Sequence, residues 1–221
     1  MIPLRDVIPS RTTPYITITI IVLNAVAWLF EVAMPPDLLP SFLQVYGVVP
    51  AHFFPPTLIT SMFLHGSWMH VIGNMWYLWI FGDNVEDRVG HGRFILFYLL
   101  CGIAAAVGQI AMDPSSTLPT IGASGAIAGV MGAYFVLYPH SRVLTLVPLI
   151  VFWEVIELPA ILFLGVWFVM QLFSAGAIAV TAGNSGGGGV AFAAHVAGFL
   201  TGVLGVFVFR KPQTIWDEAT S

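Results

Sequence analysis

Long apolar runs constrain this chain more than any other feature. A helix needs roughly 20 apolar residues to cross the hydrocarbon core of a membrane. Only 8% of the residues are charged, whereas soluble domains carry about 25%. We therefore expect an all-α membrane protein, a bundle of six transmembrane helices embedded in a lipid bilayer. The six expected spans cover about residues 15–33, 68–82, 94–112, 121–138, 158–178 and 190–209.

The basic residues test this division independently, because basic side chains gather at the cytoplasmic ends of membrane spans. With six spans, every arginine and lysine falls on one side of the membrane, and adding or removing one span would scatter them. We expect a cytoplasmic N-terminal segment at residues 1–14, a six-helix domain at 15–209 and a cytoplasmic C-terminal tail at 210–221. The seven basic residues are Arg5, Arg11, Arg88, Arg93, Arg142, Arg210 and Lys211.

Two of the expected outer connections have unusual compositions. Residues 34–67 are apolar but contain six prolines, which prevent one continuous helix, so we expect this segment to lie at the membrane interface, partly embedded. No small-residue cleavage site follows the first span, so we expect it to be uncleaved. Residues 184–189 read NSGGGG, and we interpret this flexible stretch as a lid that moves with the fifth span.

Composition also excludes several classes of partner. The net charge of −4 and the absence of a basic run or a Walker-type loop argue against nucleic acid. Cys101 is the only cysteine, so neither an internal disulfide nor a thiolate metal cluster can form. The HExxH pattern of metalloproteases is absent as well. We expect no metal and no cofactor.

Strongly polar side chains within the spans are few, and they are functional candidates because burying them in lipid is costly. Ser124 lies in the small-residue stretch GASGAIAG at residues 122–129, which leaves its hydroxyl accessible. The expected topology places His195 of the sixth span at a similar depth below the outer surface. His70 and Asn74, four residues apart, share one face at the outer end of the second span. Four polar positions thus converge at one depth.

These residue types suit nucleophilic acyl chemistry. A histidine in contact with Ser124 could take the hydroxyl proton and return it to a leaving amine. His70, Asn74 and the backbone N–H of Ser124 could stabilise the oxyanion. No acidic residue lies nearby within a span, so we expect a Ser124–His195 dyad. Glycine stripes on the fourth and sixth spans would let the two helices approach closely, at Gly125, Gly129 and Gly132 and at Gly198, Gly202 and Gly205.

Each polar position also has a simpler interpretation. GASGAIAG could be a packing face, and His195, His70 and Asn74 could hydrogen-bond between helices. Glu154 and Glu157 are most simply a solvated or interfacial pair. The histidines expected in the connections are interfacial or solvated, at positions His52, His65, His91 and His140.

The chain resembles the rhomboid family of intramembrane serine proteases. The resemblance rests on HxxxN at residues 70–74, GxSG at 122–125 and AHxxG at 194–198, with ExR at 86–88 in support. It implies that Ser124 is the nucleophile and His195 the general base, and that His70, Asn74 and the Ser124 amide form the oxyanion hole. Family members often carry an aromatic residue four positions after the serine, where this chain has Ala128. His195 is therefore expected to be held differently.

The resulting expectation is an endopeptidase that cuts transmembrane helices of other membrane proteins near their outer ends. The alternative is an inactive rhomboid-like protein that binds transmembrane clients without cutting them. A transporter fits less well, because the polar groups lie near one surface. We expect a multi-pass protein of a prokaryotic plasma membrane with both termini in the cytoplasm.

Overall fold

Helices dominate the structure, a computed structural model that describes residues 1–148, 153–181 and 191–212. Within these ranges, six helices of 14 or more residues occupy the positions of the six expected spans. Most boundaries agree within three residues, and the largest difference is at the second of these helices, which continues to Val89. The six are α1 (Tyr15–Ala33), α4 (Trp68–Val89), α5 (His91–Met112), α6 (Ser124–Leu137), α7 (Ala160–Thr181) and α8 (Phe192–Phe209).

Length and hydropathy separate these helices into two groups. Among the described residues, three helices are long and apolar enough to cross a membrane by themselves, namely α1, α5 and α8. The helix α6 is apolar but has only 14 residues. The last turns of α4 carry several charged side chains, including the buried Glu86. The chain is a mostly helical membrane bundle, with three candidate spans and further apolar helices among its described residues.

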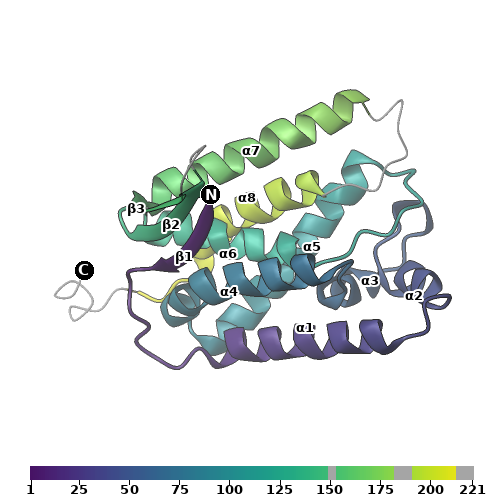
Figure 1. Cartoon of the computed structure of the whole chain (residues 1–221), viewed down its shortest axis with the longest axis horizontal. Helices are drawn as coiled ribbons and strands as arrows, with labels where there is room; N and C mark the ends of the chain where they lie inside the picture. The colour runs from purple at the N-terminus through teal and green to yellow at the C-terminus, as the bar shows by residue number, and fades with distance from the viewer. Residues whose placement is uncertain (149–152, 182–190, 213–221) are drawn as a thin grey trace.

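The centre of the bundle is α6, which is buried at every position from Gly125 to Tyr134. It contacts α4, α5, α7 and α8, while α1 packs against α4 at the edge of the bundle (Figure 1). The ring of Tyr134 meets Phe81 of α4 edge to face at 5.0 Å. An apolar helix without a polar face must be covered by other helices or by lipid, and the neighbouring helices provide this cover for α6.

Glycines bring α6 and α8 together backbone to backbone. A methyl group at Gly198 would overlap the carbonyl oxygen of Gly125, and one at Gly202 would overlap that of Gly129. Small residues permit this distance between membrane helices. Gly205, expected to belong to the same stripe, instead faces a phenylalanine ring of α5. The close approach predicted from the sequence is present, with two of the three α8 glycines forming it.

The connection between α1 and α4 is not one continuous helix, as predicted, and it consists of short helical segments. They are α2 (Leu39–Tyr46), η1 (Pro50–His52), α3 (Thr57–Thr60) and η2 (Ser61–Phe63). Buried within this segment, Val48 exchanges backbone hydrogen bonds of 3.0 and 2.8 Å with Thr120. The connection therefore supports the loop that leads into α6.

A three-stranded antiparallel sheet at one end of the bundle departs from the all-α expectation. The strands are β1 (Ile2–Asp6), β2 (Arg142–Pro148) and β3 (Trp153–Pro159), in the order β1-β2-β3. Alternate residues of β2, Val143 and Thr145, are fully buried, which is the pattern of a strand with one covered face. The N-terminal segment is therefore part of the folded structure, and the connection between α6 and α7 is a β-hairpin.

The basic residues lie at the helix and strand ends that gather on this sheet side (Figure 1). Just after α8 in the chain, the backbone N–H of Lys211 donates to the carbonyl oxygen of Arg88 at 3.0 Å. The first and the last described residues therefore lie at the same end of the bundle, beside the sheet. We call this the inner end, and the opposite end, where α2 and α3 lie, the outer end.

Candidate active site

Ser124 is the first residue of α6, and a glycine turn places it there. Gly122 has φ +121°, a conformation that residues with a side chain rarely adopt. Its N–H donates to the carbonyl oxygen of Ser61 at 2.8 Å, which fixes the turn. Ala123 precedes the helix and has no side chain able to cap it. The first N–H groups of α6, including that of Ser124, therefore remain available as donors.

The structure brings Ser124 and His195 together. The Ser124 Oγ atom lies 2.8 Å from Nε2 of His195, which is itself 8% exposed and in the first turn of α8. This is a normal hydrogen-bond distance. The glycine contacts between α6 and α8 hold the two backbones close enough for the serine and histidine side chains to meet. A hydroxyl bonded to an imidazole nitrogen can act as a nucleophile.

His70 and Asn74 lie on the outer half of α4 and face the turn before Ser124. A methyl group at Gly122 would lie 2.7 Å from His70 Nε2 and 3.7 Å from Asn74 Nδ2. Ser67 caps this helix by accepting from the N–H of His70 at 3.2 Å. Two side-chain donors and the N-terminus of α6 thus surround one point, where they could stabilise a developing negative charge.

His65 is a correction to the sequence analysis, which placed it at the interface or in solvent. It is 1% exposed, and its Nε2 lies 3.0 Å from Asn74 Nδ2. The Glu31 carboxylate of α1 accepts from its backbone N–H at 3.2 Å. Burial, and secondarily the charge of His70, lower the pKa of His65 from 6.5 to about 4. The neutral ring can therefore accept one N–H of Asn74 and leave the second for the site.

Gln171 is a second residue that sequence reasoning missed. Its Oε1 lies 2.7 Å from Nδ1 of His195. The signal was present, because Gln171 is a strongly polar side chain half-way along an otherwise apolar helix, α7. Ala128, at the position of the family's aromatic residue, is buried in the core of α6. His195 is thus held from α7, which accounts for the departure at Ala128.

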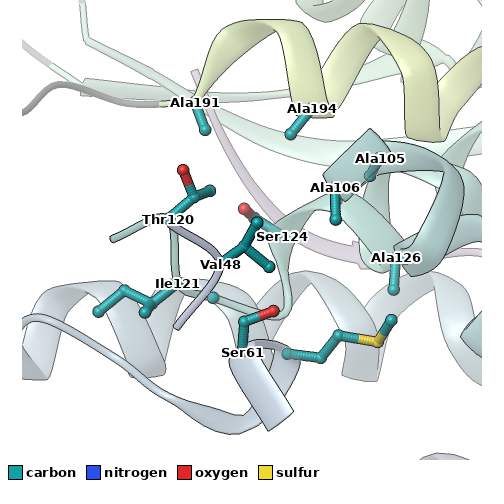
Figure 2. A pocket seen from close by; sticks show the side chains of 14 residues that line it. Val48, Ser61, Ala105, Ala106, Thr120, Ile121, Ser124, Ala126, Ala191 and Ala194 are labelled. Carbon is teal, nitrogen blue, oxygen red and sulfur yellow. The ribbon is translucent and has the colours of Figure 1, made fainter. Parts of the chain in front are cut away.

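A cavity of about 30 Å³ adjoins Ser124, enough room for about one water molecule. Figure 2 shows the Ser124 side chain in this pocket, with Ser61 and Thr120 also lining it. Most of its other lining residues are glycines, alanines and valine. The lid expected at residues 184–189 lies outside the described residues.

Comparison with known proteins identifies the family. Residues 55–212 match the Rhomboid domain. Rhomboid-like protein 11, chloroplastic, of Arabidopsis thaliana is 29% identical over 206 residues, 88% of this chain and 69% of that protein. Rhomboid protein 1, mitochondrial, of Saccharomyces cerevisiae is 30% identical over 174 residues, 74% of this chain and 45% of that protein.

A bacterial relative matches a shorter part of the chain. Rhomboid protease GluP of Bacillus subtilis is 38% identical over 85 residues, 38% of this chain and 16% of that protein. Because the relatives include chloroplast and mitochondrial proteins, they do not support the expected prokaryotic plasma membrane. The match to the Rhomboid domain covers more than half of the sequence. The chain belongs to the rhomboid family.

Proposed function

We propose that this protein is an intramembrane serine endopeptidase that hydrolyses peptide bonds in or near transmembrane helices of other membrane proteins. One observation carries the proposal: the 2.8 Å hydrogen bond between Ser124 Oγ and His195 Nε2. The names of two Bacillus subtilis relatives, Rhomboid protease GluP and Putative rhomboid protease YdcA, support it.

The proposed mechanism has two halves. Ser124 Oγ attacks the peptide carbonyl carbon while His195 Nε2 takes the hydroxyl proton, and the same nitrogen gives that proton to the leaving amine. Water then attacks the acyl carbon while His195 takes one of its protons, and the bond to Ser124 Oγ breaks as His195 gives this proton back to Oγ. The catalytic groups form a dyad, because the side chain bonded to the second nitrogen of His195 is a neutral amide.

The oxyanion of each tetrahedral intermediate is stabilised by His70, Asn74 and the N–H of Ser124. This N–H lies at the start of α6, where the helix leaves its first N–H groups without partners and the helix dipole is positive. Asn74 contributes the amide N–H that His65 does not take. The donors are fixed before the reaction, so they require little reorganisation.

The substrate class follows from the surroundings of Ser124. A peptide bond within a regular helix is shielded by its own hydrogen bonds, so a cleavable segment should contain helix-weakening residues such as glycine or proline. The cavity beside Ser124 is small and lined mainly by alanine and glycine. It supports the preference for a small residue just before the cut that the family resemblance implies.

The proposed topology places both ends of the chain on one side of the membrane. The sheet and the seven basic residues mark that side, in agreement with the preference of basic side chains for the side from which the spans insert. Ser124 and His195 then lie toward the opposite side.

A fluorophosphonate probe tests the proposal, because it reacts covalently with an activated serine. The purified wild-type chain should be labelled and should cut a membrane protein with a glycine-containing transmembrane helix. Ser124→Ala, with its thermal unfolding unchanged, should do neither. A folded wild type that binds the substrate but neither reacts nor cuts would establish the alternative, an inactive client-binding protein.

A further inference from the structure

Both ring nitrogens of His195 are engaged, each by a different helix. Nε2 faces Ser124 of α6 at 2.8 Å, and Nδ1 faces Oε1 of Gln171 of α7 at 2.7 Å. The imidazole therefore bridges the helix that carries the serine and a helix that carries no group of the proposed reaction. The proposed reaction does not by itself explain the contact between His195 and Gln171.

The acceptor at Nδ1 decides where the ring proton lies. A neutral imidazole has one N–H, and Nε2 can take the proton of Ser124 only if that N–H is on Nδ1. An amide oxygen accepts and cannot donate, so Oε1 of Gln171 stabilises this tautomer. In the other tautomer, two lone pairs would face each other. When Nε2 gains the serine proton, the bond to Gln171 remains and strengthens, because its donor is then charged.

The same helix also fixes the plane of the ring. Trp167 precedes Gln171 by one helical turn, and its ring centroid lies 5.9 Å from that of His195 at an interplanar angle of 36°. Position 128, four residues after the serine, carries only a buried alanine. One face of α7 thus supplies both the acceptor for the imidazole and an aromatic ring against it.

We propose that Gln171 is a positioning residue that holds His195 in the tautomer able to accept the proton of Ser124. This inference rests on the proposed function, in which Ser124 is the nucleophile. A glutamine that only bridged α7 and α8 would contribute to stability. A positioning residue contributes to the rate of the chemical step, and the two roles differ in which measured quantity changes.

The test uses the full chain with Gln171→Met, which keeps the side-chain length and removes the acceptor, and Gln171→Glu, which keeps an oxygen acceptor. Gln109→Met is the matched control, because Gln109 is a glutamine of α5 whose Oε1 has no partner among the described residues. We expect Gln171→Met to lower kcat and the fluorophosphonate labelling rate about ten- to a hundredfold, the range of one hydrogen bond to a charged group. KM should stay unchanged, Gln171→Glu should restore most of the rate, and Gln109→Met should resemble wild type.

Other results would overturn the inference while leaving the dyad in place. They are an unchanged kcat in Gln171→Met, a rise in KM alone, or equal losses in Gln171→Met and Gln171→Glu. Absent labelling of the wild type would instead contradict the proposed function. If Gln171→Met does not fold, the ¹⁵N spectrum of histidine-labelled wild type decides. The resonances missing in His195→Ala must be those of a ring protonated on Nδ1, and protonation on Nε2 overturns the inference.

Discussion

Two buried carboxylates lie at opposite ends of α1, and their surroundings differ. Glu86 of α4 lies beside the first turn of α1, and Glu31 belongs to its last turn. Glu86, at the inner end, accepts from the N–H of Ile16 at 3.0 Å and from the N–H and hydroxyl of Thr17, both at 2.7 Å. It also contacts His91. Glu31, at the outer end, accepts only from the backbone of His65 among the described residues.

This contrast extends to the neighbouring polar groups. At the inner end, polar side chains bind each other and the backbone, as Asp6 does with the hydroxyl of Tyr134 at 2.7 Å. At the outer end, the contact with His65 leaves one N–H of Asn74 for the proposed oxyanion hole. Under the proposed function, the inner end uses its polar groups for stability and the outer end uses them for chemistry. Matched substitutions at the two ends test this division.

The largest contrast is expected between two histidines. His195→Ala removes the proposed base and should lower the cleavage rate by at least about four orders of magnitude, with little change in the unfolding temperature. His91→Ala removes the partner of Glu86 at the inner end and should keep the turnover of the folded enzyme. Cleavage of a transmembrane substrate and thermal unfolding in detergent measure both. Equal losses of turnover in the two variants would contradict this division between the two ends.

The next contrast uses two asparagines of α4. Asn74→Ala removes one oxyanion donor and should lower kcat about a hundred- to a thousandfold. Asn84, buried at the inner end, donates to the carbonyl oxygen of Ile8 at 3.2 Å. Asn84→Ala should lower the unfolding temperature and leave kcat unchanged. A normal kcat in Asn74→Ala would remove this residue from the oxyanion hole.

The two buried carboxylates give a smaller contrast, in stability. Glu86→Gln keeps one acceptor oxygen but loses the charge at the start of α1, and it should cost about 2 kcal/mol, or roughly 5 °C in unfolding temperature. Glu31→Gln should cost less, because a single N–H depends on that carboxylate. Calorimetry of the two variants measures the difference. The reverse order would show that the outer end also depends on its buried charge.

The smallest effect concerns pH. Burial raises the pKa of Asp6 from 3.8 to about 6. The folded state therefore favours the protonated carboxyl, and the resulting stabilisation is complete below about pH 3.8 and lost as pH rises through about 6. Asp6→Asn, which stays neutral, should raise the unfolding temperature at pH 7.5 by about 2 °C, since solvent screens this half-buried group. At pH 3.5 the variant and wild type should unfold at similar temperatures.

The helix positions and the shared side of the basic residues were predictable, because lipid requires long apolar helices and the charges must avoid it. The pair of Ser124 and His195 was predictable for a related reason. Few polar side chains occur within the spans, and glycine stripes indicated which two helices approach. These patterns lie within single segments of the chain.

The sheet and the supporting residues were not predicted. The alternation at Val143 and Thr145 is short and lies in an apolar stretch, and β1 pairs with a strand more than 130 residues away. His65 was assigned to the interface or to solvent, although the neighbouring elements bury it. Gln171 was a visible polar residue, but only the packing of α7 against α8 shows which atom it contacts. Contacts between distant segments decide these three cases.

The length of α6 has a consequence for the membrane itself. Its 14 residues extend about 21 Å at 1.5 Å per residue, whereas the hydrocarbon layer is about 30 Å thick. With its inner end at one boundary, this helix stops about 9 Å short of the other. Because of this shortfall, the polar backbone that precedes α6 enters the membrane to a depth that lipid would otherwise fill. Water that solvates this backbone can reach the same depth. For the proposed hydrolysis, a truncated central helix would thus bring the reacting groups inside the bilayer within reach of water without opening a channel through it.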